Sequence, residues 1–304
     1  MDLLEHAQGQ RLVHDSLQNE LSRRWLDPVL TDLLREVSAA RREVDAELRH
    51  RFARVRTREG FDMQTYPVGW CRHIRDGVWN RVQGSLLIQS LIRQGLVFRK
   101  VFVVQRRQFF QNSIQLGDHF LDVANDAVDA HKPPVVCETL AEAGVEDLDS
   151  WPQFAEVAQP YDRVRLLPNR WFPLVFPVMP FLAIRESGLV EGLYQQDQLF
   201  LLDVGEHFRR ARELLSHSLW LTCPIPDGLD QELVKRFTGP SAQPLPIEFR
   251  PSSRADLQMT LKDWEAVTQL PLDRLRATLL TTLRLTGELA QALRRAGIQF
   301  KPGS

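Results

Sequence analysis

The chain has little cysteine and no long apolar segment, and each shortage excludes a class of protein. Its 304 residues include only three cysteines, at positions 71, 137 and 223, with no CxxC pair and no even set for a disulfide framework. The longest strongly apolar run, WFPLVFPVMPFLAI (171–184), contains three prolines and is too short to cross a bilayer. The sequence therefore predicts neither a disulfide-stapled secreted domain nor a membrane protein.

A large net charge of either sign is also missing. The 38 basic residues nearly balance the 39 acidic ones, so no global field attracts nucleic acid or anionic lipid. Only five of the basic residues are lysine, a bias that we attribute to coding composition. The first ten residues, MDLLEHAQGQ, lack the basic and apolar stretches of a secretory signal. We expect a cytoplasmic, reduced protein, with export by a signal-less route left open.

Helical periodicity dominates the first third of the chain. Apolar residues recur near the 3.6-residue period through residues 1–60, where Pro28 offers a break between two helices. Residues 69–94 predict two more helices, which Gly84 separates and Gly95 closes.

The period then changes to two. Residues 96–105 predict a strand, and residues 109–126 predict two strands around an LGD turn. A proline-punctuated region follows, with short strands expected at PFLAI (180–184) and QLFLLDV (198–204). Helix returns at 205–221, and again at 257–296 with Gly297 closing it.

These patterns together predict an α+β fold. It has N-terminal helices, a small antiparallel sheet packed on a cysteine-bearing helix, and C-terminal helices. The expected segments are a helical region, an α+β core, a Pro/Ser-rich connection and a second helical region, at residues 1–60, 61–221, 222–256 and 257–304.

One stretch of this plan carries candidate chemistry, YPVGWCRHIRDGVWNRV (66–82). Cys71 follows a Pro-x-Gly turn and stands where the helical pattern begins. A helix start stabilises a thiolate, because unpaired amides and the positive dipole end lie there. A cysteine nucleophile also needs a base held by a third group. The alternative is a buried thiol that fills a core, since free cysteine is among the most buried residue types.

The order of elements from about residue 63 to 130 resembles the papain-like and transglutaminase-like cysteine superfamily. The similarity rests on PVGWC (67–71) and on LGDHFLDVAND (116–126), joined by helices and a strand. Members of that superfamily place cysteine at a helix start, then histidine on one strand and an acid on the next. The resemblance therefore implies that Cys71 is the nucleophile position and Asp122 the orienting acid.

The histidine position departs from the superfamily pattern. Eleven residues before Asp122, where the resemblance implies histidine, the chain has Gln111. A glutamine amide cannot accept the thiol proton, although it can donate a hydrogen bond to an oxyanion. His73, His119 and His131 are substitutes, but none stands at the expected position.

Two functions follow. The first is a degenerate relative, a pseudoenzyme that binds a protein partner; Gln111 favours it. The second is a cysteine-dependent hydrolase or acyl/amide transferase acting on a peptide-like or carrier-bound substrate, with Cys71, Gln111 and Asp122 in the site. For binding we single out His119 and an aromatic-proline stretch with Arg170, Trp171 and Phe176, which can otherwise be a buried wall. No cofactor is expected.

Metal and nucleic acid are both disfavoured. GDHFLDVANDAVDAH (117–131) is rich in oxygen ligands but lacks EF-hand and HExxH spacings, so ordinary strand-end turns explain it and no metal is expected. The arginines of residues 257–296 are diluted by acids, which favours a packed helical pair over a helix-turn-helix reader of DNA.

Overall fold

The computed structural model describes residues 9–52, 63–194, 196–226, 228–238 and 245–299. The chain divides into two compact units, Gln8–Leu148 and Asp149–Ser304. This boundary lies inside the segment 61–221 that the sequence predicted as one core. We describe each unit by itself.

The first unit opens with a helical run through the expected break. α2 (Ser16–Leu21) continues into η1, a π-helical turn (Ser22–Leu26), then into η2, a 3₁₀ turn (Asp27–Val29), and then into α3 (Leu30–Phe52). Pro28 stands in the first turn of the 3₁₀ segment, where its missing N–H costs no hydrogen bond. The proline therefore changes the type of turn instead of ending the helix. Residues 1–8 and 53–60 of this predicted region lie outside the described part.

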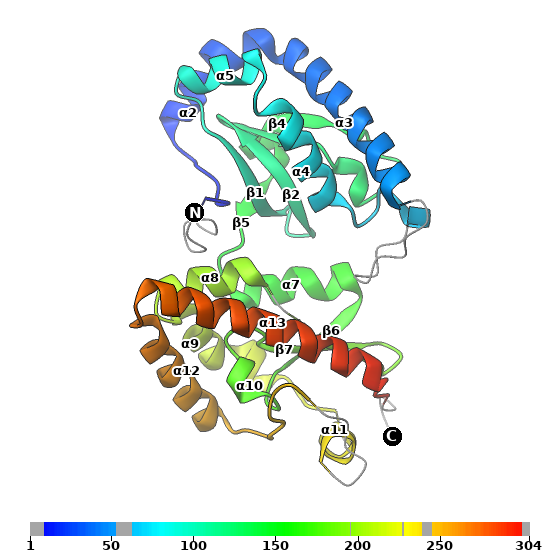
Figure 1. Ribbon diagram of the computed structural model, residues 1–304, viewed down its shortest axis with the longest axis vertical. Helices are drawn as coiled ribbons and strands as arrows, with labels where there is room; N and C mark the ends of the chain where they lie inside the picture. The colour runs from blue at the N-terminus through cyan, green and yellow to red at the C-terminus, as the bar shows by residue number, and fades with distance from the viewer. Residues whose placement is uncertain (1–8, 53–62, 195, 227, 239–244, 300–304) are drawn as a thin grey trace. The chain divides into compact units, whose positions relative to one another are not determined.

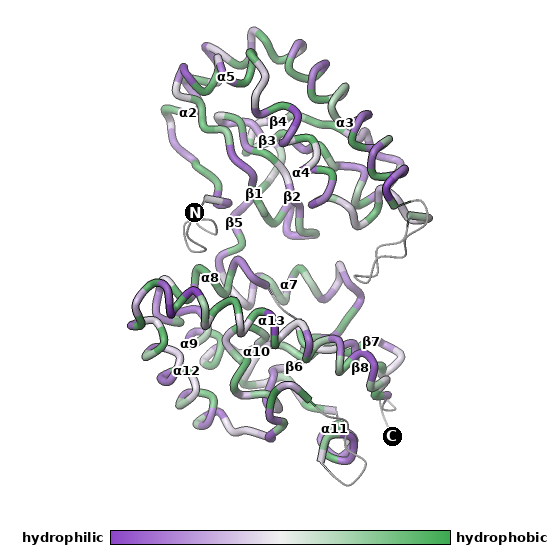
Figure 2. Tube along the Cα trace, viewed as in Figure 1, coloured by the Kyte–Doolittle hydropathy of each residue, from purple (hydrophilic) through white to green (hydrophobic). Residues whose placement is uncertain are grey.

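α3 buries one stripe, and the colours along it in Figure 2 show polar and apolar residues alternating. The stripe packs with α4 (Cys71–Val82), which is followed by α5 (Leu86–Arg93). Both of the latter helices were predicted. Ser85 caps α5 through its hydroxyl, which accepts from the Ile88 amide at 3.2 Å.

A five-stranded antiparallel sheet completes the first unit. Its spatial order is β4-β3-β2-β1-β5, and its strands are Phe98–Gln105, Phe109–Leu116, His119–Asp122, Val136–Thr139 and Val145–Asp147 in chain order. The first three strands were predicted and the two short edge strands were not. A 3₁₀ turn (η3, Met63–Thr65) precedes α4, a second (η4, Asn125–Ala127) follows β3, and α6 (Leu140–Ala143) follows β4.

The two faces of this sheet carry different cores. One face packs against α3 and α4 in a cluster that includes Ile74, Ile114 and Leu121. The other face carries Val101, Val103 and Phe120, which pack with side chains from the N-terminal segment and α6. Figure 1 shows α4 lying against β1 and β2. Because strand side chains alternate, one step along a strand moves a residue from one core to the other.

The second unit is built around a three-stranded antiparallel sheet of order β6-β7-β8. The strands are Val164–Pro168, Phe181–Arg185 and Val190–Tyr194. Its helices are α7 (Trp151–Asp162), η5 (Pro173–Val175), α8 (Asp197–Gly205), α9 (Arg209–Ser216), α10 (Ser218–Thr222), α11 (Leu229–Phe237), α12 (Arg254–Thr268) and α13 (Leu272–Ala296). α13 packs along β8.

Three sequence predictions meet different outcomes in this unit. The strand expected at 180–184 is confirmed as β7. The strand expected at 198–204 is wrong, because that apolar run is α8, a helix buried on all its sides. Such a run has no periodicity that separates strand from helix. The C-terminal helices expected in 257–296 are confirmed, and Gly297 caps the last one at φ +57°.

The segment 222–256, expected as an open connection, is tied to the second unit in part, although many of its described residues are exposed. It contains α11, and the backbone amides of Arg250 and Ser252 donate to the carbonyls of Trp171 and Arg170 at 2.9 and 2.7 Å. Residues 239–244 of this segment lie outside the described part. The C-terminal helices are therefore part of the second unit.

The fold class is α+β with helices at both ends, as predicted. Among the described residues, none of the helices combines the length and apolar character that crossing a membrane requires.

Candidate functional site

Cys71 is the first residue of α4, as the sequence predicted. The turn before it is closed by the Trp70 amide, which donates to the Pro67 carbonyl at 3.0 Å, and Gly69 adopts φ +82° within it. The Gly69 amide also donates to the Ala127 carbonyl at 3.0 Å, which ties the turn to η4. Trp70, the N-cap residue of α4, is fully buried, and its side chain makes no capping hydrogen bond to the first-turn amides.

The thiol of Cys71 contacts an amide. Asn112 on β2 donates from Nδ2 to Sγ at 3.4 Å, while its Oδ1 accepts from Nη1 of Arg75 at 2.9 Å. Arg75 is buried one helical turn after the cysteine, where it also reaches the Val101 carbonyl and Asp76. Burial lowers the pKa of Arg75, an effect that Asp76 opposes, and a guanidinium starts so high that it stays charged. The thiol is therefore linked through one amide to a buried cation.

Gln111 and Asp122 form a buried pair on neighbouring strands. Nε2 of Gln111 donates to Oδ2 of Asp122 at 2.8 Å and to the Ala124 carbonyl at 3.1 Å. Oδ1 of Asp122 accepts the Ala124 amide at 2.9 Å. Burial raises the pKa of Asp122 to about 6, although these hydrogen bonds oppose the rise.

This pair lies on the sheet face opposite Cys71, which corrects the expectation that Cys71, Gln111 and Asp122 share one site. Gln111 pairs in register with Val103, which belongs to the cluster away from α4. Cys71 packs with the cluster on the α4 side, and the residue of β2 that meets it is Asn112. Gln111 and Asn112 are consecutive, so the pleat of the strand points them to opposite faces.

The three histidines have partners other than the thiol. The His73 ring lies 5.1 Å from the Trp70 ring, between centroids. His119 is buried with Nε2 3.6 Å from a carboxylate oxygen of Asp27, and the exposed His131 contacts its neighbour Asp129. In the described part of the chain, the hydrogen-bond partner of Sγ is the Asn112 amide. That partner cannot accept a thiol proton.

Two aromatic rings extend the surface around the thiol. Phe102 pairs in register with Asn112, and Phe110 stands two residues before Asn112 on the same face of β2. The two rings stack with centroids 5.7 Å apart, and both are half-buried. We call Cys71, Asn112, Phe102 and Phe110 the Cys71 face. The period-two pattern of FFQNSI could have identified its strand residues once the facing side was known.

The aromatic-proline residues predicted for binding lie in the core of the second unit. Trp171 and Phe176 are fully buried. The indole Nε1 of Trp171 donates to Asp230 at 2.6 Å, and the Phe176 ring lies edge-on to Trp220. Arg170 is half-buried and reaches the Trp220 carbonyl at 3.5 Å. Trp171 and Phe176 thus belong to the buried wall that the sequence left as the alternative.

Neither the remaining thiols nor the acidic segment forms a metal site. Cys137 lies in an apolar setting, where burial raises its pKa to about 12. Asp126 is held by Arg41, and Asp129 by His131. Within the ranges that the structure describes, no three His, Cys, Asp or Glu residues gather as a metal would require.

Compared with protein-family models, curated proteins and solved structures, the chain shows no match. The similarity to papain-like and transglutaminase-like proteins thus rests on the short motifs of the sequence.

Proposed function

We propose that the Cys71 face binds a protein or peptide-like partner, on a scaffold whose element order resembles that of cysteine enzymes, and that it carries out no acyl transfer. One observation carries the proposal: the side chain against the thiol is Asn112. An amide can donate to a bound carbonyl but cannot act as the base that an acyl-transfer nucleophile needs.

The composition of the face suits a peptide. Phe102 and Phe110 are half-buried and stacked, so they give a rigid apolar surface at little cost in side-chain entropy. Aromatic residues are enriched in the central part of protein interfaces. Beside them, the thiol and the Asn112 amide offer polar groups to a peptide backbone.

A peptide library displayed on phage, selected on the wild-type protein, tests the binding. Peptides enriched in that selection are synthesised, and their affinity is measured by fluorescence anisotropy. We expect Phe102→Ser and Phe110→Ser each to weaken binding at least tenfold, which corresponds to about 1.4 kcal/mol. Phe109→Ser is the matched control, since Phe109 is the neighbouring, equally half-buried residue on the other face of β2. Equal losses in all three variants would contradict a site on the Cys71 face.

The second candidate function, a thiol enzyme, is favoured by the position of Cys71 at a helix start whose N-cap side chain does not cap it, with a buried cation one turn away. Its test is the turnover of an acyl thioester by wild type and by Cys71→Ser. The binding proposal expects the same slow background hydrolysis from both proteins. Turnover that depends on Cys71 would replace it with the enzyme.

A further inference from the structure

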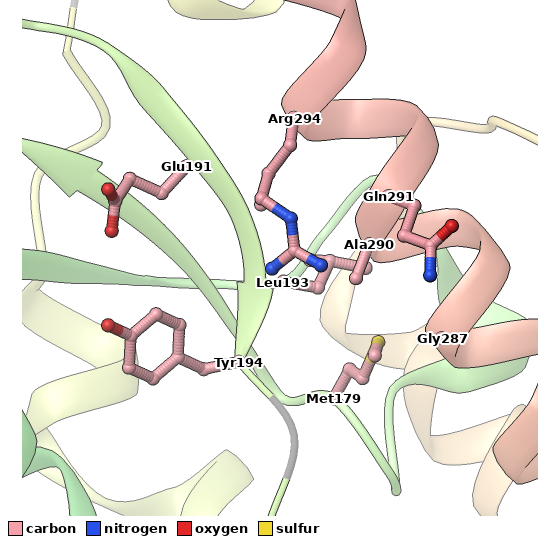
Figure 3. A pocket seen from close by; sticks show the side chains of 9 residues that line it. Met179, Glu191, Leu193, Tyr194, Gly287, Ala290, Gln291 and Arg294 are labelled. Carbon is pink, nitrogen blue, oxygen red and sulfur yellow. The ribbon is translucent and has the colours of Figure 1, made fainter. Parts of the chain in front are cut away.

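A second site stands in the second unit, independent of the Cys71 face. A pocket of about 480 Å³ opens between β8 and the C-terminal half of α13 (Figure 3). Small-molecule sites commonly span about 300 to 1,000 Å³, so this pocket is large enough for a metabolite.

Two glycines border the pocket. Gly192 on β8 adopts φ +134°, a conformation that L side chains rarely adopt, and a Cβ there would be in ordinary contact with the Ala290 carbonyl of α13 at 3.4 Å. Gly287, one turn before Ala290, borders the pocket, and a Cβ there would meet nothing within 4 Å. A glycine in the middle of a long helix lowers the helix propensity relative to alanine, and here it leaves an open volume.

The wall from α13 supplies uncompensated positive charge. The Arg294 side chain extends from the helix over Leu193 (Figure 3). In the described ranges its guanidinium makes no hydrogen bond or ion pair, although a carboxylate, Glu191, lines the same pocket and pairs with Arg185 instead. Gln291 adds an amide from the same helix. A planar guanidinium free of a partner is suited to hold a carboxylate through two parallel hydrogen bonds.

The wall from β8 supplies hydrogen-bond acceptors. The Tyr194 hydroxyl hydrogen-bonds to Asp162, and burial together with this carboxylate raises the pKa of the phenol. Burial also raises the pKa of Asp162. A phenol that donates to a carboxylate keeps its lone pairs for a ligand donor, and the Glu191 carboxylate stands two residues before Tyr194. Between the two walls, Met179 and Leu193 provide buried apolar surface.

We propose that this pocket binds a small zwitterion of the amino-acid or dipeptide class. Its carboxylate meets Arg294 and Gln291, its ammonium lies towards Tyr194 and Glu191, and an apolar side chain rests on Met179 and Leu193. The thioether of Met179 suits this last contact, because it adapts to side chains of differing shape.

Calorimetric titration of the full chain tests the proposal with defined probes. L-leucine and L-leucyl-L-leucine carry both charges, N-acetyl-leucine lacks the ammonium, leucinamide lacks the carboxylate, and inorganic phosphate is an anion alone. We expect at least one of the two zwitterions to bind and each truncated probe to bind at least tenfold more weakly. Equal binding by N-acetyl-leucine or phosphate would overturn the zwitterion in favour of a simple anion site, and no heat from any probe would overturn the site.

Variants test whether binding depends on the residues of the pocket or on any positive charge nearby. Arg294→Gln should weaken the zwitterion at least tenfold and leave leucinamide unchanged. Arg295→Gln, at the next and also exposed position of α13 and outside the pocket, should change neither. Gly287→Leu should fill the volume and abolish binding while the far-UV circular dichroism stays that of wild type. Equal losses from the Arg294 and Arg295 variants would contradict a built pocket.

Discussion

Arg41 joins α3 to the segment that follows β3, and it does so from a buried position. Its Nε donates to Asp45 at 2.7 Å, and its two terminal nitrogens reach the two carboxylate oxygens of Asp126 at 2.9 Å each. Nη1 also donates to the carbonyls of Val123 and Pro134. Burial opposes the charge, but the hydrogen bonds with Asp126 and Asp45 outweigh it and raise the pKa of Arg41.

Removing this one guanidinium should be costly. Arg41→Met leaves Asp126 buried without its partner, which in other proteins costs about 3–5 kcal/mol. We expect a loss of that order in the free energy of unfolding, measured by urea denaturation. Arg42→Met, the neighbouring exposed arginine, is the control and should change stability by less than about 0.5 kcal/mol. Similar losses in both variants would mean that the Asp126 pair contributes nothing.

Asp122 should make stability depend on pH in an unusual direction. Its pKa is raised from 3.8 to about 6, so between these pH values the folded state binds more protons than the unfolded state. The contribution of Asp122 to the free energy of unfolding is therefore largest below about pH 4. It falls as the pH rises and stays constant above about pH 6. Relative to Asp122→Asn, wild type should lose up to about 3 kcal/mol between pH 4 and pH 7. Urea midpoints across this range measure the difference; parallel curves would contradict it.

Sequence reasoning reached Cys71 and the Gln111–Asp122 pair, but not the strand residues that lie on the same side of the sheet as the thiol. The helix start at Cys71 follows from a Pro-x-Gly turn ahead of a 3.6-residue period, and the closeness of Gln111 and Asp122 follows from a hairpin. Successive residues of a strand point to opposite faces of the sheet, so an error of one residue in the expected position selects a side chain on the wrong face. The superfamily spacing selected Gln111, whereas the fold presents Asn112.

At the scale of elements, the long periodic segments were predicted, whereas α7, α8, β4 and β5 were not. α7 was missed because its sequence contains Pro152 and Pro160. The first stands in the opening turn, where helices tolerate proline, and the second lies in the last turn. α8 was taken for a strand because it is apolar all round. β4 and β5 are too short for an alternation to register, and their pairing depends on contacts distant in sequence.

The contact between α3 and α4 depends on one missing side chain. A Cβ on Gly77 of α4 would lie 2.8 and 2.9 Å from the two Cγ atoms of Val44 on α3, and Val44 is buried. On a free helix, Gly77→Ala would add up to about 1 kcal/mol of helix propensity. Here the clash should outweigh that gain, because valine is stiff at χ1 and overpacking costs about 1–3 kcal/mol.

A double-mutant cycle isolates this contact. Gly77→Ala alone and Val44→Ala alone should each lower the urea midpoint. The double variant should be more stable than the sum of the two losses predicts, by about 1 kcal/mol or more. Additive losses would show that the two helices do not meet at Gly77.

At the scale of the whole molecule, each unit closes on itself. In the first unit, the amide of Leu12 donates to Oδ1 of Asp147 at 2.8 Å, and the amide of Val13 donates to Oε1 of Gln115 at 2.9 Å. The beginning and the end of the unit therefore meet on the same sheet. Its described core clusters are drawn entirely from Gln8–Leu148. A segment with its own core and few contacts across its boundary is expected to fold alone.

We expect chain fragments to place the boundary between the two folding units at residue 148. The sequence suggested a boundary in the Pro/Ser-rich segment instead. Fragments 8–148 and 149–304 should each unfold in urea with one cooperative transition, followed by tryptophan fluorescence. Fragment 149–253, which lacks α12 and α13, should show none. It loses Trp264, whose ring lies 5.9 Å from that of Phe200 and 5.7 Å from that of Phe208, and whose indole donates to the Leu174 carbonyl. It also loses the helix that packs along β8. The contrary outcome is a cooperative transition in fragment 149–253 together with none in fragment 149–304. It would mean that the second unit does not need the C-terminal helices, and that the domain boundary lies in the Pro/Ser-rich segment.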